Sequence, residues 1–561
     1  MLAVLLSTLL LAFLVLTFGH AAKTALRLEA NAWDTAFLGI AAVNTVCAWA
    51  SLAVPVGTPL LVAMLLTAGV YAYRLGKVNR AEPLLGDLFR SIQPTFWVLF
   101  LLACFIATED PRNPDTPLYH LQSIMWYEQY PVVPGLGNLH GRLAFNQNVF
   151  LLFSLTSLKD LFGQEIFSVN LLVFVIYSTY ILKRLRDIHA LQGFTPVWFF
   201  YLLLGIFVFR MPNLSSPSPD NLSQILSFYI FTRVVDMYLD GKSEAFDQAP
   251  VLLLLGFYTF TVKLSAAPMP LLFLVLLLYR TGPGLMDYLR LVPAVLLMFI
   301  PWIARNVIMS GWLVFPFPSL DLFSFDWKVP LEDVQTWKIL VTGWARMAGE
   351  DNYLRAYHMS FSEWFPIWFR HLPKTSMLET VLIVLGFLVP VIGFAGMLLG
   401  RVSRSPVLVS ILLTCILGIF SWLMLGPTFR FGAAVITVSA FSFLLFMRPV
   451  TFGTPSFLKT HLQTWVIGLL AVMLMLRNTK ALEFPDLKKP VKMTRLLKPD
   501  LVPIKGQSYE LRKASNFEYF QPRLHGYCYD CSIPCTPIPD STLALRGGGL
   551  RQGFRKTSVG P

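Results

Sequence analysis

The sequence predicts an all-α protein that crosses a membrane many times. Hydrophobic residues make up 55% of its 561 residues, charged residues only 14%, and the mean hydropathy is +0.60. A soluble protein keeps roughly 25% of its residues charged. The apolar residues also gather in runs of the length that a membrane helix needs, which is ~20 residues, or fewer where a helix is buried in protein.

The apolar runs, taken in order, give the candidate spans. We expect membrane helices at 2–19, 35–53, 58–73, 93–107, 166–182, 196–210, 222–239, 250–263, 266–279, 288–304, 378–400, 406–425, 430–447 and 462–476. No basic residue precedes the first run, so we interpret it as a span and not as a signal peptide. The run 146–158 is too short to cross, and we expect an interfacial helix there, in the headgroup plane.

Basic residues set the expected orientation. The chain has 45 Lys and Arg against 32 Asp and Glu, a net charge of +13, and the basic residues mostly flank apolar runs. Cytoplasmic anchoring explains this pattern better than nucleic-acid binding does. If each span crosses once, the outer face receives the loops 108–165, 211–220, 305–377 and 426–429, together with the tail after 477.

These boundaries divide the chain into segments. We expect N-terminal spans with a basic loop, a core, a Trp-rich outer segment, the last spans, and a small outer tail, at 1–92, 93–312, 313–377, 378–476 and 477–561. The tryptophans of the outer segment suit either stacking on sugar rings or anchoring of amphipathic helices at the interface. The stretch GGGLRQGFRK at 547–556 is expected to be disordered.

Two acids are candidates for chemistry. Asp115, in DTPLYH, follows a span that delivers the chain to the outer face, where a carboxylate can accept a proton from an incoming hydroxyl. Asp220, in SSPSPDNLSQ, lies at the outer mouth of a later span, where an unpaired carboxylate is costly. Both residues also suit the simpler role of a helix N-cap.

Three cations lie near the outer ends of separate spans. They are Lys263 in TVKLSAAPMP, Arg305 in PWIARN and Arg430 in GPTFRFG. Cations at this depth suit a lipid-linked phosphate, because guanidinium groups bind phosphate oxygens bidentately and lysine adds a point charge. Each of them alone also suits snorkelling to the interface.

Three cysteines in the tail form the pattern C-x-x-C-x-x-x-C. These are Cys528, Cys531 and Cys535. An oxidising outer face favours a disulfide, whose pairing the sequence does not give, with one cysteine left over. The alternative is the beginning of a zinc site, for which His525 is the nearest further ligand.

In their order along the chain, these segments resemble the GT-C superfamily of integral-membrane glycosyltransferases, which use polyprenyl-phosphate-linked sugars. DTPLYHLQSIMW is similar to the family's acid loop, with Asp115 followed by Tyr119, and SSPSPD to its second acid element. LHGRLAFNQNVF is similar to the histidine element, with His140, although Gly-Arg follows in place of Pro-Pro. TVKLSAAP resembles the Thr-Lys-Gly hairpin, with Ser in place of Gly. The resemblance covers roughly residues 93–312 and Arg430.

The resemblance implies an inverting transfer of a sugar from a polyprenyl phosphate to a glycan, lipid or protein acceptor. The reaction would occur at the outer face of a plasma membrane, such as the bacterial inner membrane, with Asp115 as general base. The implied phosphate-binding residues are Lys263, Arg305 and Arg430, and the implied substrate contacts are Tyr119, His120, His140, Arg142 and Asp220. No cofactor is required, although a divalent metal is compatible with these residues. The alternatives are a polymerase or ligase of lipid-linked glycans, and a transporter or flippase.

Overall fold

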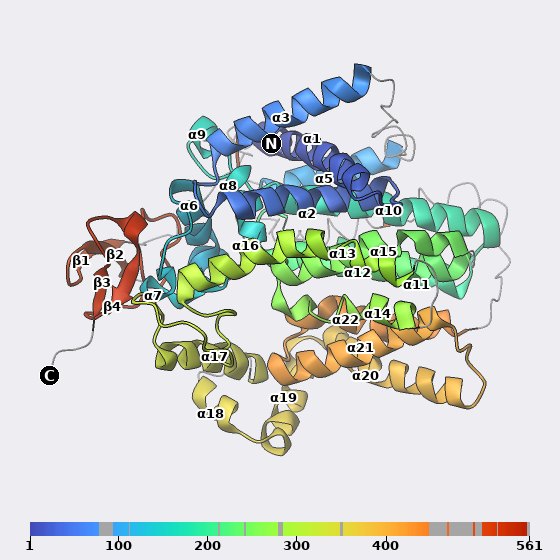
Figure 1. Cartoon of the computed structure of the whole chain (residues 1–561). Helices are drawn as coiled ribbons and strands as arrows, with labels where there is room; N and C mark the ends of the chain where they lie inside the picture. Colours follow the sequence, from blue (N-terminus) through green and yellow to red (C-terminus); the bar gives the residue numbers. More distant parts are fainter. Residues whose placement is uncertain are drawn as a thin grey trace, which may run out of the picture.

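The structure, a computed structural model, is mostly helical. It describes residues 1–77, 94–111, 113–210, 214–240, 243–278, 284–347, 352–447, 468–469, 497–499, 508–523 and 526–557. Five helical segments are long and apolar enough to span a membrane: α1 (Leu2–Ala25), α3 (Thr58–Lys77), α15 with α16 (Leu285–Leu289 and Val292–Ser310), α20 (Met377–Leu398) and α21 (Pro406–Leu425). These helices indicate a membrane protein (Figure 1).

Most of the other expected spans are also helices. They are α2 (Ala32–Ala50), α5 (Pro94–Ala107), α10 (Val169–Gln192), α11 (Pro196–Phe209), α12 (Pro219–Asp240), α13 (Ala249–Val262), α14 (Leu271–Leu278) and α22 (Phe429–Phe441). The expected span 462–476 lies outside the described residues apart from 468–469. Helix α12 is buried from Pro219 to Met237 because α10, α13, α21 and α22 surround it.

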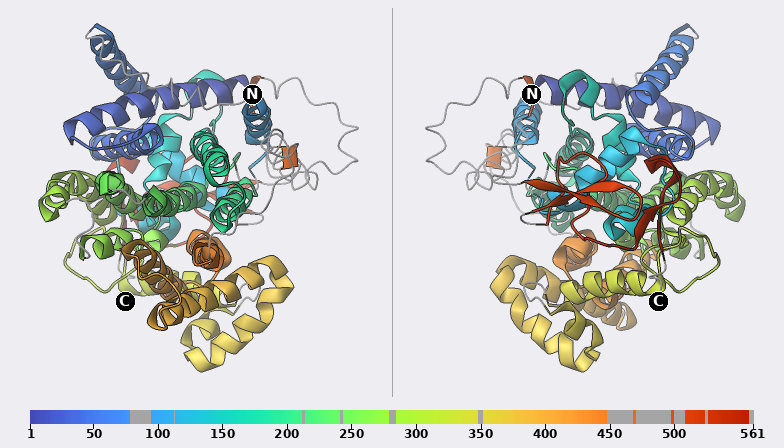
Figure 2. Two further views of the ribbon diagram at one scale, coloured as in Figure 1. Left: turned by 90° about the vertical axis from the view of Figure 1, so that its right-hand side faces the viewer. Right: turned by 90° about the vertical axis from the view of Figure 1, so that its left-hand side faces the viewer.

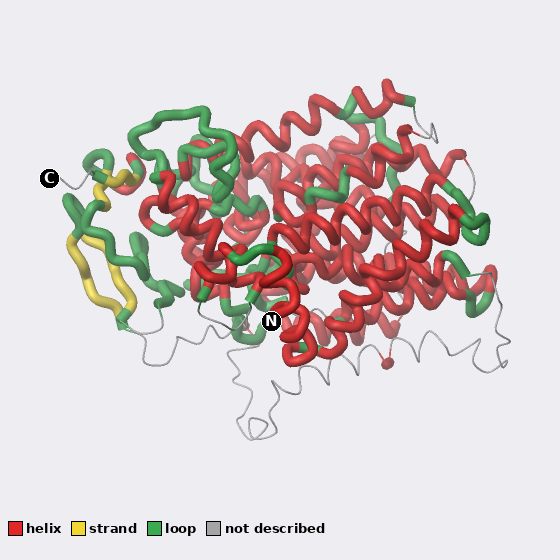
Figure 3. The backbone as a smooth tube through the Cα atoms, turned by 90° about the horizontal axis from the view of Figure 1, so that it is seen from below, coloured by secondary structure: helices red, strands yellow, loops and turns green. Residues whose placement is uncertain are grey.

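The short helices that follow α5 and the β-hairpins of the tail gather at one end of the helical bundle, which we call the loop end. One group follows α5: η1 (Thr116–His120), α6 (Leu121–Gln129), α7 (Leu136–Leu139), η2 (Gly141–Ala144), α8 (Val149–Leu155) and α9 (Lys159–Phe162). Two antiparallel hairpins cover them, β1–β2 (Tyr509–Lys513 and Glu518–Pro522) and β3–β4 (Leu543–Leu545 and Phe554–Lys556). Figures 2 and 3 show the strands at this end of the molecule.

Three further helices lie beside the loop end. They are α17 (Leu331–Arg346), α18 (Tyr353–His358) and α19 (Phe361–Thr375), and α19 leads directly into α20 (Figure 1). On α19, Trp364 and Trp368 are buried, whereas Phe361 and Phe369 are exposed. This division of the aromatic residues is typical of a helix that lies at a membrane surface.

The interfacial helix expected at 146–158 is not a surface helix, so that prediction was wrong. Every residue of α8 is buried, and the helix packs against α2, α3, α6 and α12. The polar residues that precede α8 are satisfied inside the protein. Asn146 donates to the Trp302 carbonyl (2.7 Å) and Asn148 to the Thr261 hydroxyl (3.3 Å). The segment therefore finds both its apolar and its polar partners in neighbouring helices and not in the headgroup region.

The prediction of disorder at 547–556 was also wrong. The stretch contains β4, and its Phe554 side chain is fully buried, 5.8 Å from the ring of Trp126. The Phe554 amide donates to the carbonyl of Pro134 at 2.9 Å. One buried aromatic residue therefore anchors a glycine-rich segment that composition alone favours as disordered.

A network of buried charges joins the helices near the opposite end of the bundle. Arg233, on α12, pairs with Asp34 (3.2 Å) and with Asp236 (3.1 Å). The hydroxyls of Tyr229 and Tyr180 donate to these two carboxylates, each at 2.6 Å. Since buried charges are tolerated when they are paired and hydrogen-bonded, the network joins α2, α10 and α12 and leaves the loop end as a separate polar region.

Candidate active site

Asp115 lies immediately before η1, at the point where the chain leaves α5 and turns along the loop end. Its amide donates to Asn113 Oδ1 (2.9 Å), and its side chain makes no capping bond to the turn. The carboxylate instead pairs with Nη2 of Arg430. The simple N-cap role therefore does not account for this residue.

Asp115 belongs to a cluster of four charged residues, which we call the charged quartet. Asp220 lies in the first turn of α12, Lys263 caps the end of α13, and Arg430 lies in the first turn of α22. Lys263 Nζ pairs with Asp220 Oδ1, and Arg430 Nε lies 2.9 Å from Asp220 Oδ2. Since Arg430 also pairs with Asp115, the quartet links three helix ends to the Asp115 turn. It contains two positive and two negative side chains.

The two halves of the quartet differ in exposure. The side chains of Arg430 and Asp115 are 34% and 18% exposed, against 13% for Lys263 and 9% for Asp220. Gln224 on α12 donates to the Arg430 carbonyl at 2.6 Å and fixes the start of α22. A ligand can therefore reach the Asp115–Arg430 pair, while the Asp220–Lys263 pair supports it from inside.

Asn113, which the sequence reasoning missed, connects the two acidic turns. Its amide donates to Ser216 Oγ and its Nδ2 to Ser218 Oγ, both at 3.1 Å. The same Ser218 oxygen accepts from the Asp220 amide at 3.3 Å. An asparagine two residues before an aspartate, with proline between them, is a turn signal in its own right, so the Asn-Pro-Asp pattern at 113–115 is the signal that would have found this residue.

Arg305, the third cation expected to bind phosphate, does not join the quartet. The side chain is fully buried on α16, where Nη1 donates to Asn148 Oδ1 (2.7 Å) and the guanidinium lies 4.8 Å from the Tyr127 ring. Around it, α16 packs against α2, α13, α7 and η2. Because the Arg305 side chain is fully buried, a lipid phosphate cannot reach it in this arrangement of the chain.

Arg142 is a second accessible cation near Asp115. Its guanidinium lies 5.4 Å from the Trp337 ring on α17, and it forms no ion pair with any residue that the structure describes. Burial lowers the pKa of Arg142, while the nearby Tyr119 side chain and the Asp115 carboxylate oppose that shift. Arg142 is therefore close enough to Asp115 to feel its field and has no carboxylate partner within the described chain.

Tyr119 and His120 are buried behind the quartet. The two rings meet edge to face at 4.5 Å, and His120 also lies 5.2 Å from Phe150. Burial lowers the pKa of His120 to about 4, against the opposite influence of Asp115 and Asp220, so the ring is neutral at pH 7. Neither of its nitrogens has a hydrogen-bond partner among the described residues, which leaves one donor and one acceptor unused beside the quartet.

His140 packs against α17 rather than against the quartet. Its ring lies 5.4 Å from Trp337, and burial lowers its pKa to about 3. The next residue, Gly141, has no room for a side chain, since a Cβ there would lie 2.0 Å from Trp337 Nε1. The departure from Pro-Pro after the histidine therefore has a steric reason, which is the close approach of α17.

The tail pairs Cys528 with Cys535 in a disulfide and leaves Cys531 as a buried free thiol. This disulfide loop packs directly on the Asp115 turn: the Tyr529 amide donates to the Pro117 carbonyl at 3.0 Å. His525 lies outside the described residues. Within the described part of the chain, no three His, Cys, Asp or Glu side chains are grouped to hold a metal ion.

The family described as Domain of unknown function (DUF8201) matches residues 1–437, and the chain belongs to this family. No curated protein and no solved structure matches the chain. The matched residues contain the whole charged quartet and Arg142, whereas the disulfide loop lies beyond them.

Proposed function

We propose that the protein is a membrane glycosyltransferase of GT-C type, which moves a sugar from a polyprenyl phosphate to an acceptor at the loop end, on the outer face of a plasma membrane. The observation that carries this proposal is the contact between Asp115 and Arg430 at an accessible point of the charged quartet. A carboxylate that can take a proton and a guanidinium that can bind a phosphate lie next to one another there, as sugar transfer from a lipid phosphate requires.

The proposed reaction is a displacement at the anomeric carbon of the donor sugar. The Asp115 carboxylate takes the proton from an acceptor hydroxyl, whose oxygen forms a bond to the anomeric carbon of the donor sugar. The bond between that carbon and the phosphate oxygen breaks, and the polyprenyl phosphate leaves with the electron pair. Attack from the side opposite the leaving group inverts the anomeric configuration. Positioning and charge stabilisation supply the catalysis.

Arg430 and Arg142 are the proposed holders of the phosphate. Arg430 is the most exposed member of the quartet, and Arg142 has no carboxylate partner among the described residues. An arriving phosphate competes with Asp115 for Arg430, which releases the carboxylate to act as a base. Lys263 keeps Asp220 neutralised during this exchange, so Arg430 remains in place.

The test uses the full chain in lipid nanodiscs with polyprenyl-phosphate-linked hexoses as donors. Asp115→Asn should lower donor turnover by ~10²–10⁴-fold, the usual contribution of a general base. It should not weaken donor binding, because Asp115 competes with the phosphate for Arg430. Asp160→Asn is the matched control, because Asp160 is an exposed acid on α9 in the same loop. Retained turnover in Asp115→Asn would exclude the catalytic assignment.

The same preparation separates the alternatives. A flippase would move the lipid-linked sugar across the bilayer without consuming it, and a polymerase or ligase would need a lipid-linked glycan of several sugars. Arg142→Gln and Arg430→Gln should each weaken donor binding. If both variants bind the donor as the wild type does, the phosphate role is wrong.

A further inference from the structure

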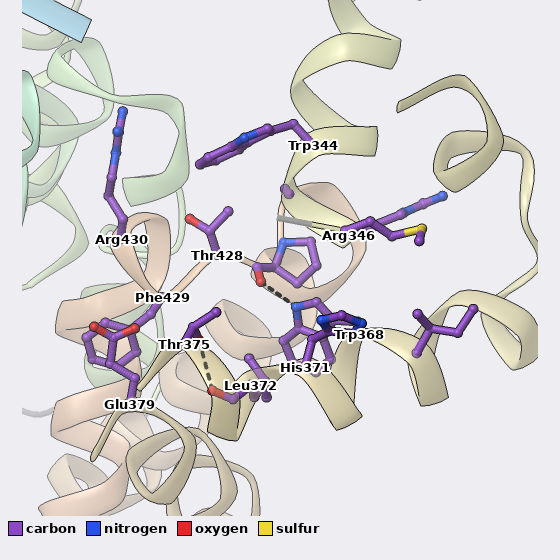
Figure 4. Close-up of a pocket in the computed structure, with 14 residues that line it drawn as sticks. Trp344, Arg346, Trp368, His371, Leu372, Thr375, Glu379, Thr428, Phe429 and Arg430 are labelled. Atoms are coloured by element: carbon purple, nitrogen blue, oxygen red, sulfur yellow. Dashed lines mark hydrogen bonds between the residues drawn. The ribbon is translucent and has the colours of Figure 1, made fainter. Parts of the chain in front are cut away.

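A cavity of about 270 Å³ lies beside Arg430, which is one of the residues that line it (Figure 4). Its walls come from the end of α17, from α19, from the start of α20 and from the segment 427–430. The side chains that matter here are Trp344, Trp368, His371, Thr375, Glu379 and Thr428. The cavity therefore adjoins the proposed reaction centre through a single residue, Arg430.

The walls combine flat aromatic surfaces with hydrogen-bonding groups. Trp344 is 37% exposed and presents its ring on the side of Arg430, as Figure 4 shows. Trp368 is held rigidly, because its Nε1 donates to the Pro427 carbonyl at 2.8 Å. Thr428 Oγ1 is buried and has no hydrogen-bond partner among the described residues. Since a buried hydroxyl normally has a partner, this atom points to a ligand with polar groups.

We propose that this cavity is a carbohydrate subsite that takes a sugar ring of the acceptor. The inference rests on the proposed function and adds the class and the place of one substrate. A sugar ring has an apolar face that can lie on Trp344 and hydroxyls that can reach Thr428, His371 and Glu379. With this ring in the cavity, one acceptor hydroxyl can extend past Arg430 to the Asp115 carboxylate.

The size of the cavity argues against a long lipid chain as the occupant. Pockets for drug-sized ligands measure ~300–1,000 Å³, so this cavity fits one or two sugar rings and not a long isoprenoid. Its lining also carries His371, Thr375 and Glu379, whose polar side chains suit the hydroxyls of a sugar. The wall itself is fixed, because Arg346 at the end of α17 donates to the carbonyls of Ala356 and Tyr357 at 3.2 and 2.8 Å.

The test measures binding of a glycan array, and of simple methyl glycosides, to the full chain in phosphatidylcholine nanodiscs. The wild type should bind a subset of the glycans. Trp344→Ala should weaken that binding at least tenfold, Trp344→Phe should keep most of it, and Thr428→Val should weaken it severalfold. Trp49→Ala is the matched control, because Trp49 is similarly exposed (40%) but lies on α2, and it should bind as the wild type does.

Three outcomes overturn the proposal: no glycan binds the wild type, Trp344→Ala binds glycans as well as the wild type, or the cavity variants lose only binding of a polyprenyl phosphate probe. Asp115→Asn separates this test from that of the proposed function, since it should retain glycan binding. Glycan binding that depends on Trp344, in a protein without transferase turnover, would keep the subsite and reject the proposed reaction.

Discussion

The attachment of the tail to the Asp115 turn gives the sharpest prediction about the loop end. Gln122, buried in the first turn of α6, donates from Nε2 to the carbonyls of Tyr529 (3.1 Å) and Cys531 (2.8 Å). Both carbonyls lie inside the loop that the Cys528–Cys535 disulfide closes. We therefore expect Gln122→Ala to loosen the Asp115 turn as well as the tail.

The magnitude follows from the two lost hydrogen bonds. Each contributes ~0.5–1.5 kcal/mol, so their loss weakens the attachment by ~1–3 kcal/mol. At about 1.4 kcal/mol for each factor of ten, the fraction of molecules with this contact open should rise roughly 5- to 150-fold. The helical bundle is not touched, so its melting temperature should change little.

Hydrogen exchange measured by mass spectrometry tests this prediction, because exchange reports local opening. Peptides covering 116–123 and 526–535 should exchange faster in Gln122→Ala. Gln164→Ala is the control: it also loses a bond to a tail carbonyl, that of Pro499 at 2.7 Å, but at a distance from the turn. Unchanged exchange at 116–123 in Gln122→Ala would refute the reasoning.

Three further predictions concern buried groups. His120 and His140 have folded-state pKa values of about 4 and about 3, below the value of ~6.5 in the unfolded chain. The unfolded chain therefore takes up protons first, and the free energy of unfolding should fall as the pH drops from 6.5 towards 4. At about 1.36 kcal/mol per pKa unit, His120 accounts for a fall of ~3 kcal/mol. Melting curves that do not depend on pH over this range would contradict this prediction. Gly141→Ala should push Trp337 aside and cost ~1–3 kcal/mol, which an unchanged melting temperature would disprove. Arg305→Met should fold and bind donor as the wild type does, since a buried charge is often replaceable by an apolar side chain; lost donor affinity in the folded variant would restore a phosphate role.

The helical architecture followed from local pattern, and its exceptions have local reasons. Long apolar runs in the described part of the chain become helices, so α1, α20 and α21 could be located by hydropathy. The same pattern failed for 146–158, because hydropathy does not distinguish an apolar surface that meets lipid from one that meets protein. The prediction of disorder at 547–556 rested on glycine-rich composition, and it failed because the buried Phe554 side chain anchors this segment.

The candidate site was only partly predictable. Proline and glycine mark the helix ends that carry Asp220, Lys263 and Arg430, so these residues could be chosen as a set. Arg305 met the same criteria, yet its side chain is fully buried and bonded to Asn148. Asn113 did not stand out, because its role depends on hydroxyls about a hundred residues further along the chain.

The sequence by itself determined that this chain forms apolar helices and that acids and cations stand where those helices end, since hydropathy and chain-breaking residues act over a few positions. Only the tertiary structure decided the partners. Asp115 and Arg430 are 315 positions apart, and a carboxylate chooses its cation by the distance and burial that packing creates. The same packing excluded Arg305, left Arg142 without a carboxylate among the described residues, and laid the disulfide loop over the Asp115 turn.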